Sequence, residues 1–263
     1  MSHVLRNVIV LGLMIAGACA QAQSTVTAYN TYLTAPFSAD QNPGLAAELV
    51  DYLNAKLKGK YVISLQNLPR ERLNQKVIAD LNFKGIVLFS NPIFVADLDR
   101  KKYFWTAPIM SDRNDVISPI GKKIEYRDPD SLKDKLFAGI RGNKYAGLEG
   151  RFGKDIKRAD FGSELTMLKT IALERAEVTV MAASTYNYLM KTSGKKEGLI
   201  GKLYVSPIPH LRFDRYMFVA NRNESLAKEL STVAEGMASD PEWQAILAKY
   251  GAVNPVPVAK PEQ

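Results

Sequence analysis

Short apolar runs rich in β-branched residues alternate along the chain with longer amphipathic segments. Runs of this kind, bounded by glycine, proline or aspartate, are typical of buried strands. They predict strands at Thr25–Asn30, Val62–Gln66, Gly85–Phe89, Val116–Ile120, Phe137–Ile140, Val178–Met181, Leu203–Val205 and Tyr216–Ala220.

The segments between these runs carry apolar residues at helical spacing, as in the stripe Leu45, Leu49 and Leu53. Ser163 before one segment and Asp240-Pro241 before another are helix-start signals, because such side chains cap the first free backbone N–H groups. The pattern predicts helices at Gly44–Leu57, Glu71–Ala79, Leu132–Lys135, Glu164–Arg175, Ala183–Lys191, Leu226–Ala238 and Trp243–Lys249.

Alternation of strands and helices predicts an α/β fold with mainly parallel sheets. The segment Tyr29–Leu53 is informative, because a strand ends there in a polar loop with Ala35-Pro36-Phe37, turns at Asn42-Pro43-Gly44 and continues as a helix. Open α/β sheets form ligand crevices at the carboxyl ends of their strands. This loop is therefore expected to face a ligand.

The first residues have the composition of a secretory signal. Arg6 supplies a positive start, Val8–Ala18 is apolar, and small residues offer cleavage after Ala20 or Ala22. The apolar run is shorter than a bilayer-spanning helix requires. We expect residues 1–22 to be a cleavable signal peptide and the mature protein to reside in the periplasm.

Few catalytic chemistries are open to the mature chain. Cys19 is the single cysteine; acylation there would anchor the protein in a membrane, although the leucine of the usual motif is absent from Ala16-Gly17-Ala18. Cleavage removes this thiol, and His210 is the one histidine after the signal, so a His/Cys metal cluster is excluded. Phosphate-loop, dinucleotide and serine-hydrolase motifs are absent. We expect no catalytic residues, no metal and no cofactor.

The formal net charge is +8, and loss of Arg6 with the signal lowers it to +7. The basic residues are spread out, so we expect no nucleic-acid partner, whereas an anionic ligand is compatible with the excess. The proline-rich end, residues 253–263, is expected to be a disordered tail.

Several motifs together resemble the extracellular solute-binding family 3 of bacterial periplasmic proteins. They are Leu68-Pro69-Arg70-Glu71-Arg72 at a helix start, Asp99-Arg100-Lys101-Lys102, the run Trp105-Thr106-Ala107-Pro108-Ile109, and the closing helix Glu242–Gly251. The resemblance covers nearly the whole mature chain through loose motifs.

The resemblance implies a type II periplasmic binding fold, a two-lobed clamshell in which each lobe is a mostly parallel sheet flanked by helices. Lobe 1 would hold residues 24–110 and 213–252, and lobe 2 residues 111–212, with crossings near Ile109–Arg113 and His210–Asp214. A ligand would bind between the lobes and shift them toward a closed state.

The resemblance also implies a ligand site. Arg100 matches the arginine that holds a ligand carboxylate with its planar fork, and the loop Arg141-Gly142-Asn143-Lys144-Tyr145 matches the one that offers backbone N–H groups. Thr34 stands where the family has an aromatic platform, with Tyr32 as a substitute. Ala182 stands at or beside the aspartate that binds an α-ammonium group. The expected ligand-binding residues are Tyr32, Thr34, Phe37, Arg70, Arg100, Arg141, Gly142, Asn143, Tyr145, Ala182 and Tyr186.

Plain structural roles compete with several of these assignments. Arg100 is equally consistent with a solvated charge, Arg70 with a helix-surface charge, and Phe37 with packing under the first loop. Carboxylate pairs such as Asp97/Asp99 and Asp112/Asp115 are interpreted as charged turns.

The leading hypothesis is a monomeric, non-enzymatic binding protein that delivers a small polar or anionic molecule, other than a standard α-amino acid, to the membrane permease of an ABC-type transporter. The alternative is an accessory or signalling protein of the same fold that binds another periplasmic protein, for example as the helper of a periplasmic dehydrogenase. The third hypothesis is an enzyme on this fold, such as a dehydratase of a cyclic acid, which would need a general acid that the sequence does not offer.

Overall fold

A computed structural model describes residues 23–38, 43–141, 143, 145, 147–153 and 157–255. The strands are β1 (Ser24–Asn30), β2 (Tyr61–Asn67), β3 (Ile86–Ser90), β4 (Tyr103–Trp105), β5 (Met110–Pro119), β6 (Phe137–Ile140), β7 (Arg158–Phe161), β8 (Val178–Ala182), β9 (Leu203–Val205) and β10 (Leu211–Ala220). The helices are α1 (Gly44–Lys56), α2 (Arg70–Leu73), α3 (Leu148–Phe152), α4 (Glu164–Ala172), α5 (Ala183–Thr192), α6 (Glu224–Met237) and α7 (Pro241–Lys249), with short turns η1 (Asn74–Ile78), η2 (Pro92–Val95) and η3 (Pro129–Leu132).

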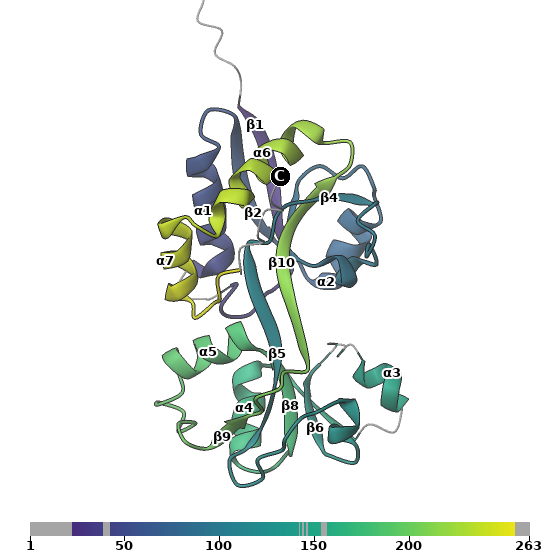
Figure 1. Ribbon diagram of the computed structural model, residues 1–263, viewed down its shortest axis with the longest axis vertical. Helices are drawn as coiled ribbons and strands as arrows, with labels where there is room; N and C mark the ends of the chain where they lie inside the picture. Colours follow the sequence, from purple (N-terminus) through teal and green to yellow (C-terminus); the bar gives the residue numbers. More distant parts are fainter. Residues whose placement is uncertain are drawn as a thin grey trace, which may run out of the picture.

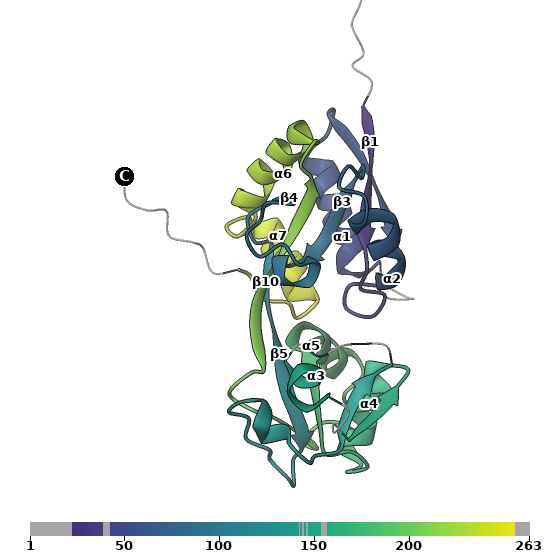
Figure 2. The same cartoon turned by 90° about the vertical axis from the view of Figure 1, so that its right-hand side faces the viewer.

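The elements form two lobes joined by two long strands (Figure 1). Lobe 1 contains β1–β4 with α1, α2, α6 and α7, and lobe 2 contains β6–β9 with α3, α4 and α5. The strand order is β2-β1-β3-β10-β5-β8-β6-β7, with β4 beside β10 and β9 beside β5. Figure 2 shows β5 and β10 running side by side from one lobe to the other.

Each lobe has a parallel set of three strands, as predicted. β1 pairs in parallel with β2 and β3, and β6 pairs in parallel with β7 and β8. Every antiparallel pairing between named strands involves β5 or β10. The predicted α/β clamshell of the type II periplasmic binding fold is confirmed, with the antiparallel pairs confined to the strands that connect the lobes.

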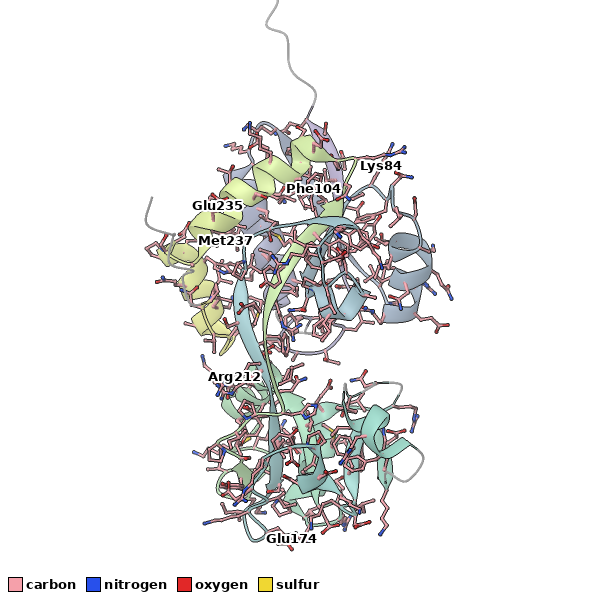
Figure 3. The ribbon with its side chains drawn as sticks, turned by 45° about the vertical axis from the view of Figure 1, so that its right-hand side comes forward. Lys84, Phe104, Glu174, Arg212, Glu235 and Met237 are labelled. Carbon is pink, nitrogen blue, oxygen red and sulfur yellow. The ribbon has the colours of Figure 1, made fainter. Side chains whose placement is uncertain are left out.

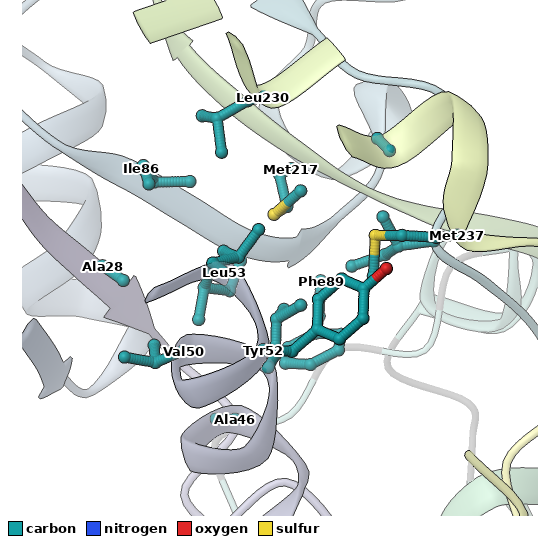
Figure 4. Close-up of a cluster of buried hydrophobic side chains, with 14 of the residues drawn as sticks. Ala28, Ala46, Val50, Tyr52, Leu53, Ile86, Phe89, Met217, Leu230 and Met237 are labelled. Carbon is teal, nitrogen blue, oxygen red and sulfur yellow. The ribbon is translucent and has the colours of Figure 1, made fainter. Parts of the chain in front are cut away.

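The core of lobe 1 lies between the sheet and α1, α6 and α7. Leu53 of α1, Ile86 of β3, Met217 of β10 and Leu230 of α6 are fully buried together (Figure 4). Burying each such side chain stabilises the fold by about 1.5–3 kcal/mol. The apolar stripe read from the sequence of α1 thus explains why this helix lies against the sheet.

The closing helix α7 is held to the start of β5. The indole N–H of Trp243 donates to the carbonyl of Ile109 over 2.7 Å, and its ring lies 5.6 Å from that of Tyr52. Asp240 caps this helix, since its carboxylate accepts from the N–H of Glu242. The cap predicted at Ser163 is also present, because its hydroxyl accepts from the N–H of Thr166. Both helix-start predictions are confirmed.

Several element boundaries differ from the prediction. β5 and β10 begin earlier than expected, at Met110 and Leu211, because polar residues continue both strands between the lobes. The helix predicted at Leu132–Lys135 is wrong: a short turn, η3, ends at Leu132 and is capped by Asp128. Four further elements, β4, β7, α3 and η2, were not predicted, because they are three to five residues long and too short for periodicity to reveal.

The start of the predicted tail is attached to the sheet. The N–H of Ser111 donates to the carbonyl of Val253 over 3.0 Å, and the amide of Asn254 donates to the carbonyl of Ala238 over 2.6 Å. Residues 256–263 and the predicted signal peptide, residues 1–22, lie outside the described residues. Within the described ranges, no helix combines the length and the apolar character needed to cross a membrane.

Candidate functional site

The candidate site lies where strand ends of the two lobes face each other. Thr34, in the loop after β1, donates from its hydroxyl to Oε1 of Glu164, the first residue of α4, over 3.2 Å. The loop before α4 follows the carboxyl end of β7. This hydrogen bond therefore joins the carboxyl-end loops of both lobes, which is where α/β sheets place ligands.

A buried ion pair connects β5 and β10 at the base of this region. Asp112 of β5 and Arg215 of β10 have side chains that are 1% and 3% exposed. Both Nε and Nη2 of Arg215 donate to Oδ2 of Asp112, over 3.0 and 2.8 Å. A buried charge persists only where partners replace its hydration, so the rest of the cluster is part of the explanation.

The remaining partners of the pair come from both lobes. Asp112 accepts from the hydroxyl of Ser184 over 2.8 Å and from the N–H of Ser184, in the first turn of α5, over 3.3 Å. The helix N-terminus favours a carboxylate at this position. Arg215 donates from Nη1 to the carbonyl of Phe89 in lobe 1 over 3.2 Å. The ion pair thus links α5 of lobe 2 to β3 of lobe 1.

Aromatic rings of lobe 1 surround the same guanidinium group. Arg215 Cζ lies 4.5 Å from the ring centroid of Tyr32, 4.8 Å from that of Phe37 and 5.0 Å from that of Phe213. Cation–π attraction of this kind is strongest where water is excluded. Arg215 therefore occupies the aromatic surface that the first loop builds.

Neither this cluster nor the burial of Asp112 was predicted from the sequence. Asp112, Asp115 and Asp97 are buried and hydrogen-bonded, so their interpretation as charged turns is wrong. Nothing in the sequence pairs Asp112 with Arg215, which are far apart in the chain and meet only through the register of β5 and β10.

The two aromatic residues of the first loop are buried to different extents. Tyr32 is half-buried, whereas Phe37 is only 2% exposed, with its ring 5.0 Å from that of Phe89 and 4.8 Å from that of Tyr32. Gly44 begins α1 with φ of +79°, and a Cβ there would lie 2.5 Å from the carbonyl oxygen of Phe37. The structure therefore places Phe37 under the loop, and both rings contact the Arg215 guanidinium.

Arg70 is used inside lobe 1. Its Nη2 donates to the carbonyl of Phe94 in η2, and its Nε donates to Oδ1 of Asn74 over 3.1 Å. The Phe94 ring in turn lies 5.3 Å from the Phe213 ring of β10. Arg70 therefore fixes η2 against the connecting strand, and its guanidinium is half-buried.

Arg100 belongs to a loop that Asp97 organises. The Asp97 carboxylate is completely buried; Oδ1 accepts from the N–H groups of Lys101 and Lys102 over 2.9 Å each, and Oδ2 accepts from the Trp105 indole over 2.7 Å. Arg100 itself is exposed, with Cζ 4.8 Å from the ring centroid of Tyr216 on β10. Its neighbouring acid, Asp99, pairs with Lys101 instead.

The predicted N–H loop of lobe 2 is shaped by Arg158. Nη2 of Arg158 donates to the carbonyls of Ile140 and Asn143 over 2.9 Å each, and its Cζ lies 5.2 Å from the ring centroid of Tyr145. The Tyr145 hydroxyl accepts from the N–H of Ile140 over 2.9 Å. Arg141 and Asn143 are exposed in this loop. Arg158 was not predicted as a site residue, and Gly142 lies outside the described residues.

Ala182 and Tyr186 lie at the junction of β8 and α5. Ala182 ends β8, pairs with Asn114 of β5 and precedes the first turn of α5. Burial raises the pKa of the Tyr186 phenol, and the Asp115 carboxylate raises it further, so the hydroxyl stays neutral. Asp115 itself accepts from Nε of Arg113 over 2.7 Å. The carboxylates nearest this junction are therefore already paired.

Comparison with known proteins places the fold. No family model matches the chain, and no curated protein matches it by sequence. The ligand-binding core of GluR0 from Nostoc punctiforme, solved with L-glutamate, has a TM-score of 0.63 at 15% identity, over 86% of this chain and 98% of that one. The substrate-binding protein AbpA of an amino-acid ABC transporter from Streptococcus pneumoniae, bound to L-arginine, has a TM-score of 0.62 at 10% identity, over 86% and 94%.

A third similar structure is an ancestral amino-acid-binding protein described as a precursor of cyclohexadienyl dehydratase. It has a TM-score of 0.61 at 16% identity, and the match covers 86% of this chain and 95% of that one. These similarities establish the type II periplasmic binding fold, and most of the similar structures are binding proteins.

Proposed function

We propose that the protein is a periplasmic solute-binding protein that captures a small polar or anionic molecule between its lobes. The lobes would be residues 24–110 with 213–252 and residues 111–212, moving about the connecting strands. The protein would act as a monomer, without catalysis or a cofactor, and deliver its ligand to the membrane permease of an ABC-type transporter. The fold and the resemblance of the motifs support this function.

The observation that supports the ligand class is that two arginines of the predicted site lack a carboxylate partner in the described part of the chain. Arg100 and Arg141 are exposed, and neither has a carboxylate within ion-pair distance among the residues that the structure describes. Arginine presents a planar fork that matches carboxylate and phosphate oxygens. An anionic group of the ligand would thus find donors on either lobe.

A standard α-amino acid also needs a carboxylate partner for its ammonium group, and the predicted site provides few carboxylates that could serve. Ala182 stands where the family resemblance expects an aspartate. The nearby Asp112 and Asp115 are buried and accept from Arg215 and Arg113. Recruiting Asp112 would break a buried ion pair, which costs several kcal/mol. Asp115 is held by Arg113, whose side chain is 39% exposed. Glutamate and arginine, found in the similar structures, therefore differ from the ligand proposed here.

The test is a ligand screen on protein freed of carried-over solute by unfolding in guanidinium and refolding. Organic acids, phosphate compounds, amino acids and polyols would be compared by thermal shift and then by calorimetry. A ligand that binds the folded state at 100 times its Kd stabilises it by about 2.7 kcal/mol. We expect stabilisation by one class of acids and none by standard amino acids, and stabilisation by amino acids alone would overturn the proposed ligand class.

Matched arginine substitutions make the screen specific. Arg100→Gln and Arg141→Gln are expected to weaken binding of the identified acid at least tenfold each. Arg175→Gln is the control, because Arg175 is exposed beside Glu174, at the far end of lobe 2 (Figure 3). Equal effects of all three substitutions would show a general charge effect. Unchanged ligand after incubation, followed by NMR, would separate binding from a dehydratase activity.

One observation favours the accessory alternative. Arg215, which contacts the Tyr32 and Phe213 rings and pairs with Asp112, already occupies the aromatic surface next to the connecting strands. A protein that binds a periplasmic partner would have no need of an open ligand site there. In that case no class of compound in the ligand screen would stabilise the protein. The lobes would keep one arrangement with or without small molecules.

A further inference from the structure

Lobe 1 has a gap in its sheet at the end remote from lobe 2. β1 pairs with β2 over its whole length, but with β3 only through Ala28 and Tyr29. On the other side of β3, β10 continues to Ala220 and pairs there with β4. β3 begins only at Ile86, so the strip between residues 24–27 of β1 and the end of β10 contains no strand. We call this strip the β3 slot.

Backbone groups of β1 point into the β3 slot. The N–H of Ser24 donates to the carbonyl of Lys60, and the carbonyl of Asn30 accepts from the N–H of Leu68, so these residues face β2. In a parallel ladder successive residues face opposite neighbours. Thr25 and Thr27 therefore direct their N–H groups away from β2, into the slot. Thr25 is exposed and Thr27 half-buried, so a partner for these N–H groups can reach them from solvent.

The β3 slot is hollow and positively charged. A pocket of about 640 Å³ lies there, lined by residues 24–27 of β1, Tyr61, residues 82–85 and the turn after β10. Its charged lining residues are Lys84 and Arg222, and no aspartate or glutamate lines it. Neither cation has an ion-pair partner in the described part of the chain. Lys84 lies at the end of lobe 1 that points away from lobe 2 (Figure 3).

We propose that the β3 slot binds an extended acidic peptide segment of a partner protein. The segment would lie beside Thr25 as a short added strand and place carboxylates near Lys84 and Arg222. Main-chain pairing supplies affinity in such strand addition, and the flanking charges supply selectivity. An open strand edge invites this pairing unless it is covered or blocked. The surface is separate from the region between the lobes.

The direct test uses a capped, fluorescent pentapeptide of sequence Glu-Val-Thr-Val-Glu, titrated with the full mature chain and followed by fluorescence anisotropy. Two control peptides isolate the contributions. Lys-Val-Thr-Val-Lys reverses the charge, and Glu-Val-Pro-Val-Glu keeps the charge but loses a backbone N–H. We expect the first peptide to bind at least tenfold more tightly than either control. If the proline peptide bound as tightly as the first peptide, the β3 slot would be a general anion site, and the proposal would be overturned.

Substitutions then locate the binding. Thr25→Pro removes the N–H that faces the slot while leaving the ladder to β2, and Thr25→Val is its matched control. The double change Lys84→Glu and Arg222→Glu tests the charges, with the exposed Lys58→Glu as control. We expect at least a fivefold loss for the test variants and less than twofold for the controls.

A competing titration with inorganic phosphate separates a peptide from a free anion. Phosphate at the same ionic strength should displace the peptide no better than chloride does. Displacement by phosphate alone, or unchanged binding by both test variants with intact melting curves, would overturn the proposal. If Thr25→Pro fails to fold, the charge-reversed variant still decides the question.

Discussion

Arg215 Nη2 lies 2.8 Å from Asp112 Oδ2, and this ion pair is buried where the two connecting strands run side by side. Asp112 is also held by Ser184 of lobe 2, and Arg215 by the Phe89 carbonyl of lobe 1. Both lobes therefore attach to one buried charge pair. We therefore expect the pair to contribute to the stability of the fold and to the arrangement of the lobes.

Removing one partner of this pair is expected to be strongly destabilising. Asp112→Asn and Arg215→Met each leave a buried group without its counter-charge, which typically costs about 3–5 kcal/mol. Urea unfolding of both single variants and of the double variant would measure the effect. The double variant should lose much less than the sum of the two singles, because it leaves no isolated charge.

The exposed pair Arg151–Asp130 provides the comparison for that experiment. Its side chains are about half exposed and joined at 2.6 Å. Arg151→Met is expected to change the free energy of unfolding far less than either substitution in the buried pair, because solvent screens the exposed charges. If the Asp112 and Arg215 variants lost no more stability than the Arg151 variant, the buried pair would have no special structural role.

Asp240 gives a defined pH dependence. Hydrogen bonds from Lys56 and then Tyr52 hold the pKa of its carboxyl at about 2, below the ordinary 3.8. A carboxyl with a lowered folded-state pKa stabilises the fold above its unfolded pKa and loses that contribution as the pH falls toward the folded value. Asp240→Asn keeps a capping acceptor for α7 but removes the charge.

We therefore expect Asp240→Asn to lower the free energy of unfolding at neutral pH by about 1 kcal/mol or less, since the pair with Lys56 is partly solvated. The difference from the parent protein should shrink between pH 4 and pH 2. Denaturant unfolding across this range measures it, and a constant difference would assign the loss to the cap rather than to the charge.

Regular elements and the site differ in how far the sequence could predict them. α1 and the parallel strands were predictable because Leu45, Leu49 and Leu53 repeat at helical spacing and because β3 is a continuous apolar run. The polar ends of β5 and β10 carry no such pattern, and their strand structure comes from pairing with each other. The Asp112–Arg215 pair depends on that register and could not be inferred from either residue.

The predicted site residues show the same limit. The motif around Arg100 lies in a loop that the buried Asp97 shapes, and sequence alone does not distinguish Asp97 from Asp99. Phe37 is buried whereas Tyr32 is half-buried, and the sequence does not distinguish the two. Whether Arg100, Arg141 and Tyr186 contact a ligand stays a prediction.

Asp97→Ala is expected to loosen the loop that carries Arg100. The substitution leaves the Trp105 indole and two backbone N–H groups without their buried acceptor, which costs about 1–3 kcal/mol for each group that stays unsatisfied. Measured in a Trp243→Phe background, the Trp105 fluorescence should shift to the red and become accessible to iodide. Asp99→Ala is the matched control, and an equal shift in both variants would contradict the assignment.

The hydrogen bond between Thr34 and Glu164 is expected to favour lobe contact. Thr34→Ala removes it, and an exposed hydrogen bond of this kind contributes about 0.5–1.5 kcal/mol, so the ratio of open to closed molecules should rise about two- to tenfold. Labels on Glu235→Cys and Glu174→Cys, in lobes 1 and 2 (Figure 3), would report the interlobe distance by energy transfer. A Cys19→Ser background leaves these as the only thiols.

Thr232→Ala is the control, because that hydroxyl donates to the carbonyl of Lys228 within α6 and does not bridge the lobes. A lower transfer efficiency for Thr34→Ala alone is expected, and identical efficiencies would mean that the buried Asp112–Arg215 pair sets the lobe angle by itself.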